Sequence, residues 1–210
     1  MVGGEGAGQC ASELLDVLGH DVRTGALAET RIGAARGMSD VVYLSIGTGI
    51  AAGIVLGGRL HAGGGYAGEI GHTPAGHDEP CACGGRGCLE AIASAAAIAR
   101  RYTARTGRPA AGAAEVLAAG DADAAAVWDE ALDALAGALA WIASVIAPQA
   151  IVIGGGLSRA GATLLDPLND RTARNLTFQP MPQLVPAALG DRAGCMGAAL
   201  LALGSIRAGT

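Results

Sequence analysis

Basic residues are scarce in this sequence, and they are scattered along it. Its 210 residues include 14 Lys and Arg against 19 Asp and Glu, which gives a formal net charge of −5. The longest basic run is the pair Arg100-Arg101. Because a surface that binds the phosphate backbone of nucleic acid needs clustered positive charge, we expect no nucleic-acid partner.

Long apolar runs are missing as well. The most apolar stretch, from Leu135 to Ala147, is shorter than the roughly 18 residues that a membrane span needs. No basic segment followed by an apolar core opens the chain, so we expect a cytoplasmic protein without a membrane partner. A hydrophobic content of 51% nevertheless argues against disorder and predicts one substantial core.

The five cysteines are unevenly distributed, at positions 10, 81, 83, 88 and 195. Three of them fall within eight residues. In a reducing compartment such a cluster indicates a metal site rather than a disulfide framework.

The residue patterns predict an α/β fold. The β-rich runs VVYLSI and IAAGIVL are joined across Gly47-Thr48-Gly49, which suits a hairpin, and GGRL leads into a third strand. A helix from about Asp123 to Ile146 carries an apolar stripe of Trp128, Leu132, Leu135, Leu139, Ile142 and Ile146. A short strand at 150–153, a helix around 162–175, a strand near 184 and a last helix follow. A three-strand meander followed by βα units indicates a mixed sheet in an α/β layer architecture.

The chain opens with a Gly-rich leader, and helix-forming sequence runs from Asp21 to Arg36. Residues 1–36 thus supply one helix and no sheet. We interpret them as a separate leading piece and residues 37–210 as the main lobe.

The strongest chemical signal is the loop GEIGHTPAGHDEPCACGGRGCLE, residues 68–90. His72, Cys81, Cys83 and Cys88 offer one imidazole and three thiols, a ligand set that suits tetrahedral zinc, so the loop is predicted to be stapled by zinc. His77 is a rival fourth ligand that spacing does not exclude. Three unligated thiols are the simpler alternative, and a bridge between Cys81 and Cys83 is disfavoured by strain.

Acidic residues flank this loop and the first helix. Folding the loop on zinc would bring Glu69 and Glu90 near one point beside His72, where carboxylates and an imidazole suit the recognition of sugar hydroxyls. Each Glu could equally be an ordinary surface acid. Asp21, at the start of its helix, is a candidate general base, and the alternative is a plain N-cap residue.

Two glycine turns could accept phosphate or nucleotide. Gly47-Thr48-Gly49 offers backbone N–H groups and a hydroxyl that could cradle phosphate, although an ordinary hairpin turn explains it as well. Gly154-Gly155-Gly156 could let a nucleotide approach the backbone, or could simply reflect tight packing.

Taken in order over residues 19–204, these motifs resemble the ROK family of bacterial repressors, open reading frames and sugar kinases, within the actin-like ATPase (ribonuclease H-like) fold. The resemblance implies that Asp21 is the base acting on a sugar hydroxyl and that His20 lies beside the sugar. It implies that Gly47, Thr48 and Gly49 form a phosphate loop and that Gly154, Gly155 and Gly156 lie near the nucleotide. It also implies that His72 and the three Cys hold zinc, while Glu69, His72 and Glu90 contact the sugar.

Three features depart from the family pattern. His20 stands where the family usually has Asn, and the interval from His72 to Cys81 is one residue shorter than usual. No D-x-G-x-T strand turn precedes Asp21. On the family pattern, residues 1–36 are the remnant of an amino-terminal lobe with its interlobe helix, and 37–210 are the carboxy-terminal lobe.

The leading hypothesis is ATP-dependent phosphorylation of a hexose or N-acyl hexosamine, glucokinase-like, with Mg²⁺ accompanying ATP and the chain forming a homodimer. On this hypothesis the present chain is an incomplete form. The alternatives are a sugar-sensing domain of a ROK-type transcriptional repressor and a structural fragment that binds no sugar.

Overall fold

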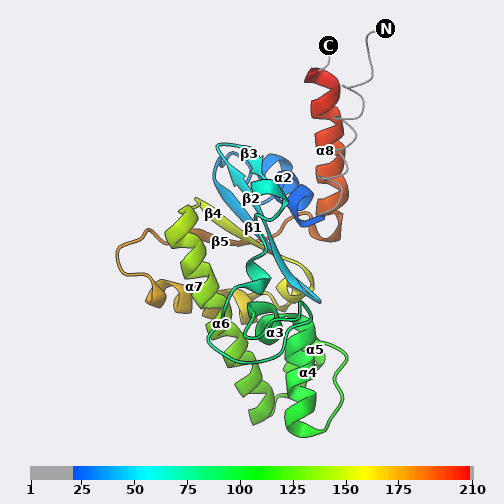
Figure 1. Ribbon diagram of the computed structural model, residues 1–210, viewed down its shortest axis with the longest axis vertical. Helices are drawn as coiled ribbons and strands as arrows, with labels where there is room; N and C mark the ends of the chain where they lie inside the picture. The colour runs from blue at the N-terminus through cyan, green and yellow to red at the C-terminus, as the bar shows by residue number, and fades with distance from the viewer. Residues whose placement is uncertain (1–20, 209–210) are drawn as a thin grey trace.

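The computed structural model describes residues 21–208, with side chains to residue 203, and its centre is a five-stranded mixed sheet (Figure 1). The strand order is β3-β2-β1-β4-β5. β1 pairs antiparallel with β2, β2 pairs antiparallel with β3, and β4 lies parallel to both β1 and β5. The strands are β1 (Val41–Ile46), β2 (Ile50–Leu56), β3 (Arg59–His61), β4 (Ala150–Gly154) and β5 (Gln183–Pro186).

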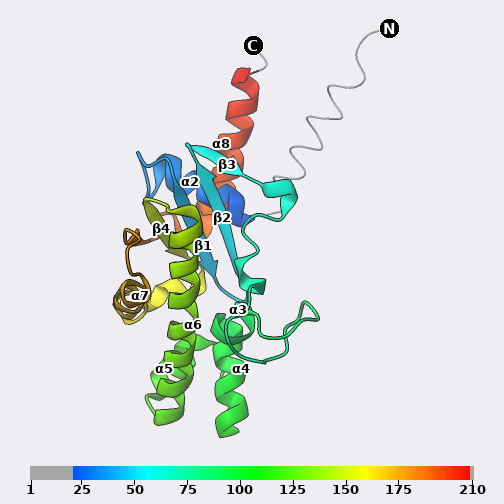
Figure 2. The ribbon, with the colours of Figure 1, turned by 60° about the vertical axis from the view of Figure 1, so that its left-hand side comes forward.

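Helices cover both faces of this sheet (Figures 1 and 2). α2 packs on one face and α8 packs against α2, and the larger core joins the other face to α3, α4, α6 and α7. The bounds are α2 (Asp21–Ile32), α3 (Leu89–Ala93), α4 (Ala95–Thr106), α5 (Ala113–Ala119), α6 (Ala122–Ile146), α7 (Ala162–Asn175) and α8 (Ala193–Ala208). The expected α/β architecture, the meander and the βα order are confirmed.

The long helix α6 has the expected bounds and the expected face. Asp121 caps its start, because the side-chain oxygen accepts a hydrogen bond from Ala124 N at 2.9 Å. Ala147, in the left-handed conformation, ends it before Pro148. The predicted apolar stripe is buried from Trp128 to Ile142 against α3, α4, α7 and the sheet, and Ile146 is partly buried. No helix in the described part of the chain is both long and apolar enough to cross a membrane.

The first helix is shorter than its sequence pattern indicates: it ends at Ile32 rather than Arg36. The fully buried carboxylate of Glu29 accepts hydrogen bonds from Ala34 N at 2.8 Å, Ala188 N at 3.2 Å and Leu189 N at 2.8 Å. Gly33 lies so close that an added Cβ would come within 2.1 Å of Glu29 Oε2. A tertiary contact therefore turns the chain out of the helix and joins α2 to the segment before α8. Residues 1–20, including His20 and Cys10, lie outside the described residues.

We predict that Glu29→Gln destabilises the protein by about 2–4 kcal/mol, because the single amide oxygen cannot accept from all three backbone donors in a fully buried site. For a chain of this size the loss corresponds to a fall in Tm of about 5–15 °C. Differential scanning calorimetry measures it, with Asp170→Asn on the exposed side of α7 as the control. Equal Tm values for the two variants would contradict the role given to Glu29.

Candidate functional site

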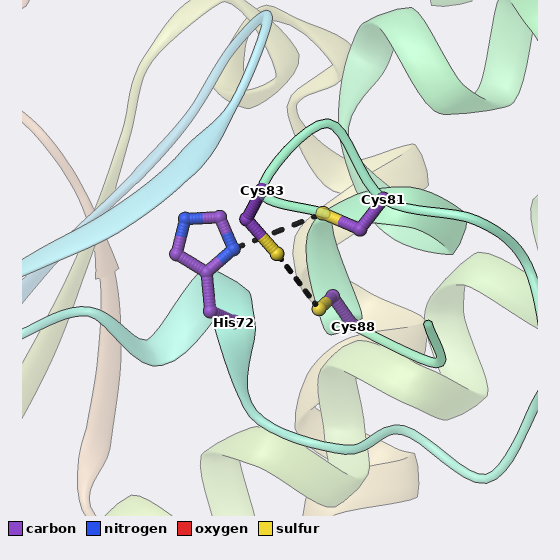
Figure 3. Close-up of side chains that lie close together, drawn as sticks. All are labelled: His72, Cys81, Cys83 and Cys88. Atoms are coloured by element: carbon purple, nitrogen blue, oxygen red, sulfur yellow. Dashed lines mark hydrogen bonds between the residues drawn. The ribbon is translucent and has the colours of Figure 1, made fainter. Parts of the chain in front are cut away.

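Four side chains that could ligate a metal ion converge in the loop between β3 and α3 (Figure 3). The imidazole of His72 and the sulfurs of Cys81, Cys83 and Cys88 point toward one another, with all ligand atoms within 4.8 Å of one another. His72 Nδ1 lies 3.8 Å from Cys81 Sγ, and Cys83 Sγ lies 3.7 Å from Cys88 Sγ. With Zn–S bonds of about 2.3 Å, two sulfurs of a tetrahedral site lie about 3.8 Å apart. The donors therefore have the spacing that one zinc ion requires.

The backbone of the loop produces this convergence. Isolated β-bridges pair Pro74 with Cys88 and Pro80 with Arg86, which folds the segment back on itself. Within the turn, Cys81 N donates to Gly85 O at 2.9 Å. Arg86 closes the outside of the loop with a salt bridge of 2.8 Å to Asp78. This pairing thus brings His72 close to three cysteines that lie nine or more residues after it in the sequence.

His77, the alternative fourth ligand, forms hydrogen bonds with the backbone through both ring nitrogens. Its Nε2 lies 3.0 Å from Cys88 O, and its Nδ1 accepts from Glu79 N at 3.0 Å. The second bond makes Nδ1 an acceptor, so Nε2 carries the proton and donates to the carbonyl. Both ring nitrogens are therefore engaged, and the imidazole that joins the three thiols is that of His72.

The thiols differ in how readily they lose a proton. The backbone N–H of Gly85, together with the neighbouring cysteines, lowers the pKa of Cys83, whereas burial raises the pKa of the Cys88 thiol to about 12. A thiolate at Cys88 therefore needs a cation beside it, because burial disfavours the charged form of the side chain.

A cavity of about 290 Å³, here called the acidic cavity, lies beside this loop. Glu69, His72 and Glu90 line it, together with the turn Gly47–Gly49. Glu90, on α3, is held in place because its Oε2 accepts from Ile50 N, at the start of β2, at 2.9 Å. Gly49 has no room for a side chain, since an added Cβ would come within 2.5 Å of that oxygen. The structure thus brings together the three predicted sugar contacts and the predicted phosphate turn.

Asp21 lines a second cavity, of about 540 Å³, here called the Asp21 cavity. Val22 and Ser45 line both cavities, so the two adjoin beside Asp21. Sequence reasoning missed Tyr43, which lines the Asp21 cavity and is 6% exposed. Burial raises the pKa of Tyr43, and the charge of Glu29 adds to the shift, so its hydroxyl stays protonated. The sequence could have indicated Tyr43, because it lies two residues before Ser45 on the same strand and alternate strand residues share a face.

The second glycine turn packs against the first. Gly155 has φ +78° and lies in the Asp21 cavity. A Cβ there would come within 2.5 Å of Ile46 O and 2.6 Å of Ile46 N. The tight-packing interpretation therefore holds at Gly155, whereas Gly156 faces open space.

Residues 14–205 match the family model described as the ROK family. The chain belongs to the ROK family. It is 37% identical over 202 residues to a glucokinase of Thermotoga maritima, covering 87% of this chain and 64% of that protein.

Two solved structures share the fold, which confirms the predicted fold class. The ROK hexokinase of Thermus thermophilus superposes with a TM-score of 0.82 at 36% identity, over 89% of this chain and 64% of that one. A ROK family glucokinase of Streptomyces griseus, in complex with glucose and AMPPNP, superposes with a TM-score of 0.76 at 32% identity. The match covers 87% of this chain and 66% of that one. The chain spans about two thirds of the length of these relatives.

We predict that Gly155→Ala costs about 2–4 kcal/mol in the free energy of unfolding, because a Cβ at positive φ would also collide with the backbone of Ile46. Gly156→Ala is the matched control, since its Cβ meets nothing within 4 Å. Urea denaturation followed by circular dichroism measures both. If the two alanine variants were equally stable, the close approach of β4 to β1 would not be what Gly155 provides.

Proposed function

We propose that this chain forms the sugar-binding and base-bearing part of an ATP-dependent hexose kinase, glucokinase-like. The observation that carries the proposal is the joining of the two cavities: Glu69, His72 and Glu90 line one, Asp21 lines the other, and Ser45 lines both. A hexose held in the acidic cavity would have one hydroxyl directed toward Asp21. The relatives named glucokinase and ROK hexokinase support this substrate class.

The roles of the residues follow from their chemistry. The carboxylates of Glu69 and Glu90 accept hydrogen bonds from sugar hydroxyls, and the free ring nitrogen of a metal-bound His72 donates one. Asp21 takes the proton from the attacking hydroxyl as the phosphoryl group is transferred. Half-buried carboxylates that line a cavity suit a polyol, because each hydroxyl finds an acceptor without burying an unpaired charge.

The phosphate side of the site lies on the glycine turns. Backbone N–H groups of the Gly47–Gly49 turn and the hydroxyl of Thr48 face the phosphates, and Gly154, Gly155 and Gly156 lie beside the nucleotide. Mg²⁺ accompanying ATP would offset the negative charge of the phosphates. In this proposal residues 1–36 belong to an amino-terminal lobe and its interlobe helix, and residues 37–210 form the carboxy-terminal lobe.

The metal in the four-ligand cluster is proposed to be zinc. Three thiolates and one imidazole are a soft donor set that favours zinc, and the donor spacing fits a tetrahedral ion. A structural ion there would hold His72 on one side of the loop and Cys88, directly before α3, on the other. Zinc would thereby fix the positions of Glu69 and Glu90.

Purified chain is predicted to contain one zinc ion, measured by inductively coupled plasma mass spectrometry. Cys83→Ser should weaken zinc binding by at least about 100-fold, since losing even an outer hydrogen-bond partner of a ligand costs about 10–100-fold. Cys195→Ser, which changes a cysteine outside the cluster, is the control and should keep the metal. Full zinc occupancy in Cys83→Ser would rule out this ligand set.

Asp21→Asn is predicted to lower sugar-dependent ADP release by about 10²–10⁴-fold, because the amide cannot take the proton. It should change the sugar dissociation constant only a few fold. A coupled ADP assay with Mg-ATP and a panel of hexoses and N-acyl hexosamines measures the first quantity, and isothermal titration calorimetry measures the second. Asp166→Asn, on the exposed side of α7, controls for the loss of one negative charge.

Three results would separate the possibilities. Equal ADP release from wild type and Asp21→Asn would remove Asp21 from the chemistry. Sugar binding without any ADP release would leave a sugar-binding part of a kinase that does not catalyse by itself. No binding of any sugar by the zinc-loaded chain would leave a structural fragment.

A further inference from the structure

Tyr43 is a buried polar side chain that lines the Asp21 cavity. It lies on β1 and is 6% exposed, and the cavity also includes Gly155 in its lining. Its ring packs between two glycines on neighbouring elements. A Cβ on Gly25 of α2 would come within 3.1 Å of the ring, and a Cβ on Gly154 of β4 would come within 2.4 Å of the hydroxyl oxygen. The helix and the sheet therefore fix where this hydroxyl lies.

The other buried tyrosine shows what the hydroxyl of such a residue ordinarily does. Tyr102 is 3% exposed, and its hydroxyl donates to Asp121 Oδ2 at 2.8 Å. Buried tyrosine hydroxyls usually find a partner of this kind. Within the described part of the chain, the hydroxyl of Tyr43 instead has the Ser45 hydroxyl, two residues along the same strand, as its hydrogen-bond partner, and it has no carboxylate acceptor.

Two hydroxyls that bond to each other leave one proton without an acceptor. Each has a single O–H, so when one donates to the other, the second O–H must find a different partner. Among residues 21–203, neither Tyr43 nor Ser45 forms a further side-chain hydrogen bond. Both line the Asp21 cavity. The pair therefore presents one hydrogen-bond donor to whatever that cavity holds.

The Asp21 cavity has few other groups that could donate to an anion. No Lys, Arg or His is among its described lining residues, and its charged side chains are the carboxylates of Asp21 and Asp191. The hydroxyl of Thr24 is already used, because it donates to Asp21 O at 2.9 Å. Burial raises the pKa of Tyr43, and nearby carboxylates raise it further, so its hydroxyl remains a donor at neutral pH. The hydroxyl donors left for a ligand are those of Tyr43 and Ser45.

We propose that the Tyr43 hydroxyl donates a hydrogen bond to an oxygen of the phosphoryl group that passes from the nucleotide to the sugar, with Ser45 holding the hydroxyl in place. The inference rests on the proposed kinase function and adds a catalytic residue to it. The hydroxyl lies against Gly154, where the proposed nucleotide turn begins, and shares its cavity with Asp21.

A neutral donor suits this position. Tyr43 keeps its own proton, and the proton of the attacking sugar hydroxyl goes to Asp21 as before. A donor fixed in advance stabilises the charge on the phosphoryl oxygens, which is the larger part of what a protein contributes to phosphoryl transfer. The acidic cavity, which holds the proposed sugar contacts, does not include Tyr43 in its described lining. The role is therefore expected on the phosphate side and not on the sugar side.

Isothermal titration calorimetry of the zinc-loaded, glucose-saturated chain with Mg-AMPPNP and with Mg-ADP tests the proposal without turnover. Tyr43→Phe should raise the Kd of Mg-AMPPNP about 5- to 10-fold, because it loses a donor to the γ-phosphoryl group. The Kd of Mg-ADP, which has no γ-phosphoryl group, should stay within about two-fold, since that bond is absent there. The Kd of glucose should be equally insensitive, since Tyr43 does not line the acidic cavity.

Sugar-dependent ADP release measures the effect on the chemical step. In Tyr43→Phe, kcat should fall about 10- to 100-fold with the KM for sugar little changed, as expected of a donor to charge that develops in the transition state. Ser45→Ala should weaken Mg-AMPPNP binding less than Tyr43→Phe does. The double variant should bind no more weakly than Tyr43→Phe alone, because the two side chains act through one hydroxyl.

Tyr102→Phe is the matched control, because it removes the hydroxyl of a tyrosine that is equally buried but lines neither cavity. It should lower the Tm by about 2–4 °C through loss of the hydrogen bond to Asp121, with the Kd of Mg-AMPPNP unchanged. Tyr43→Phe should show the reverse pattern, with the Tm of the unliganded chain within about 1 °C of wild type. A purely structural role for Tyr43 would instead lower its Tm and leave the ratio of the Mg-AMPPNP and Mg-ADP affinities unchanged.

The outcomes separate this role from the proposed function. Equal weakening of Mg-AMPPNP and Mg-ADP by Tyr43→Phe, or no weakening of either, would overturn the phosphoryl contact. Weaker binding of glucose alone would place Tyr43 on the sugar side and overturn it as well. A wild-type chain that binds glucose but not Mg-AMPPNP would show that the Asp21 cavity takes no phosphate, so the role of Tyr43 would fall while the sugar site stands. The comparison of ADP release from wild type and Asp21→Asn tests the kinase separately.

Discussion

The parallel pairing of β1 with β4 positions the whole candidate site. The register runs from Val41 opposite Ala150 to Ser45 opposite Gly154, so both strands end at the same edge of the sheet. Gly155 allows the chain leaving β4 to lie directly against Ile46, which brings the two glycine turns together. Ligand sites in open α/β sheets form at the carboxyl ends of strands, and both cavities of this protein lie there.

Helices on opposite faces of the sheet then supply the side chains. α2 packs on one face, where Glu29 near its carboxyl end accepts hydrogen bonds from the segment before α8. Asp21, at the amino end of α2, lies at the edge of the sheet where β1 and β4 end. α3 belongs to the core on the other face and presents Glu90, held by Ile50 N. The candidate base and the candidate sugar contacts thus approach the strand ends from two sides. A rigid sheet between them fixes their separation better than any loop would.

Sequence patterns predicted the helices and strands well, because buried apolar residues recur along each of them at the regular spacing of that element. The stripe of α6 and the strands of the meander are examples, and the cysteine spacing was enough to find the cluster of candidate metal ligands. Spacing alone could not choose between His72 and His77, since that choice depends on the backbone hydrogen bonds that occupy both nitrogens of His77. Nor could it place the end of α2, which is set by the contact of Glu29 with residues about 160 positions later in the chain. The role of each site residue remains a prediction.

The segment from Glu69 to Thr73 has few ways to hold its shape by itself. Between residues 61 and 88 only Gly71, Gly87 and Cys88 are buried, so the loop has almost no core of its own. Glu69 and His72 line the acidic cavity, whereas Ile70 and Thr73 line a separate hollow beside α6. Such a segment must be held by what contacts its two faces, because each ordered residue costs conformational entropy that burial here does not offset. A metal ion at His72, as proposed, would hold the face that lines the acidic cavity. In the proposed function, the affinity of that cavity for a sugar would then depend on the metal.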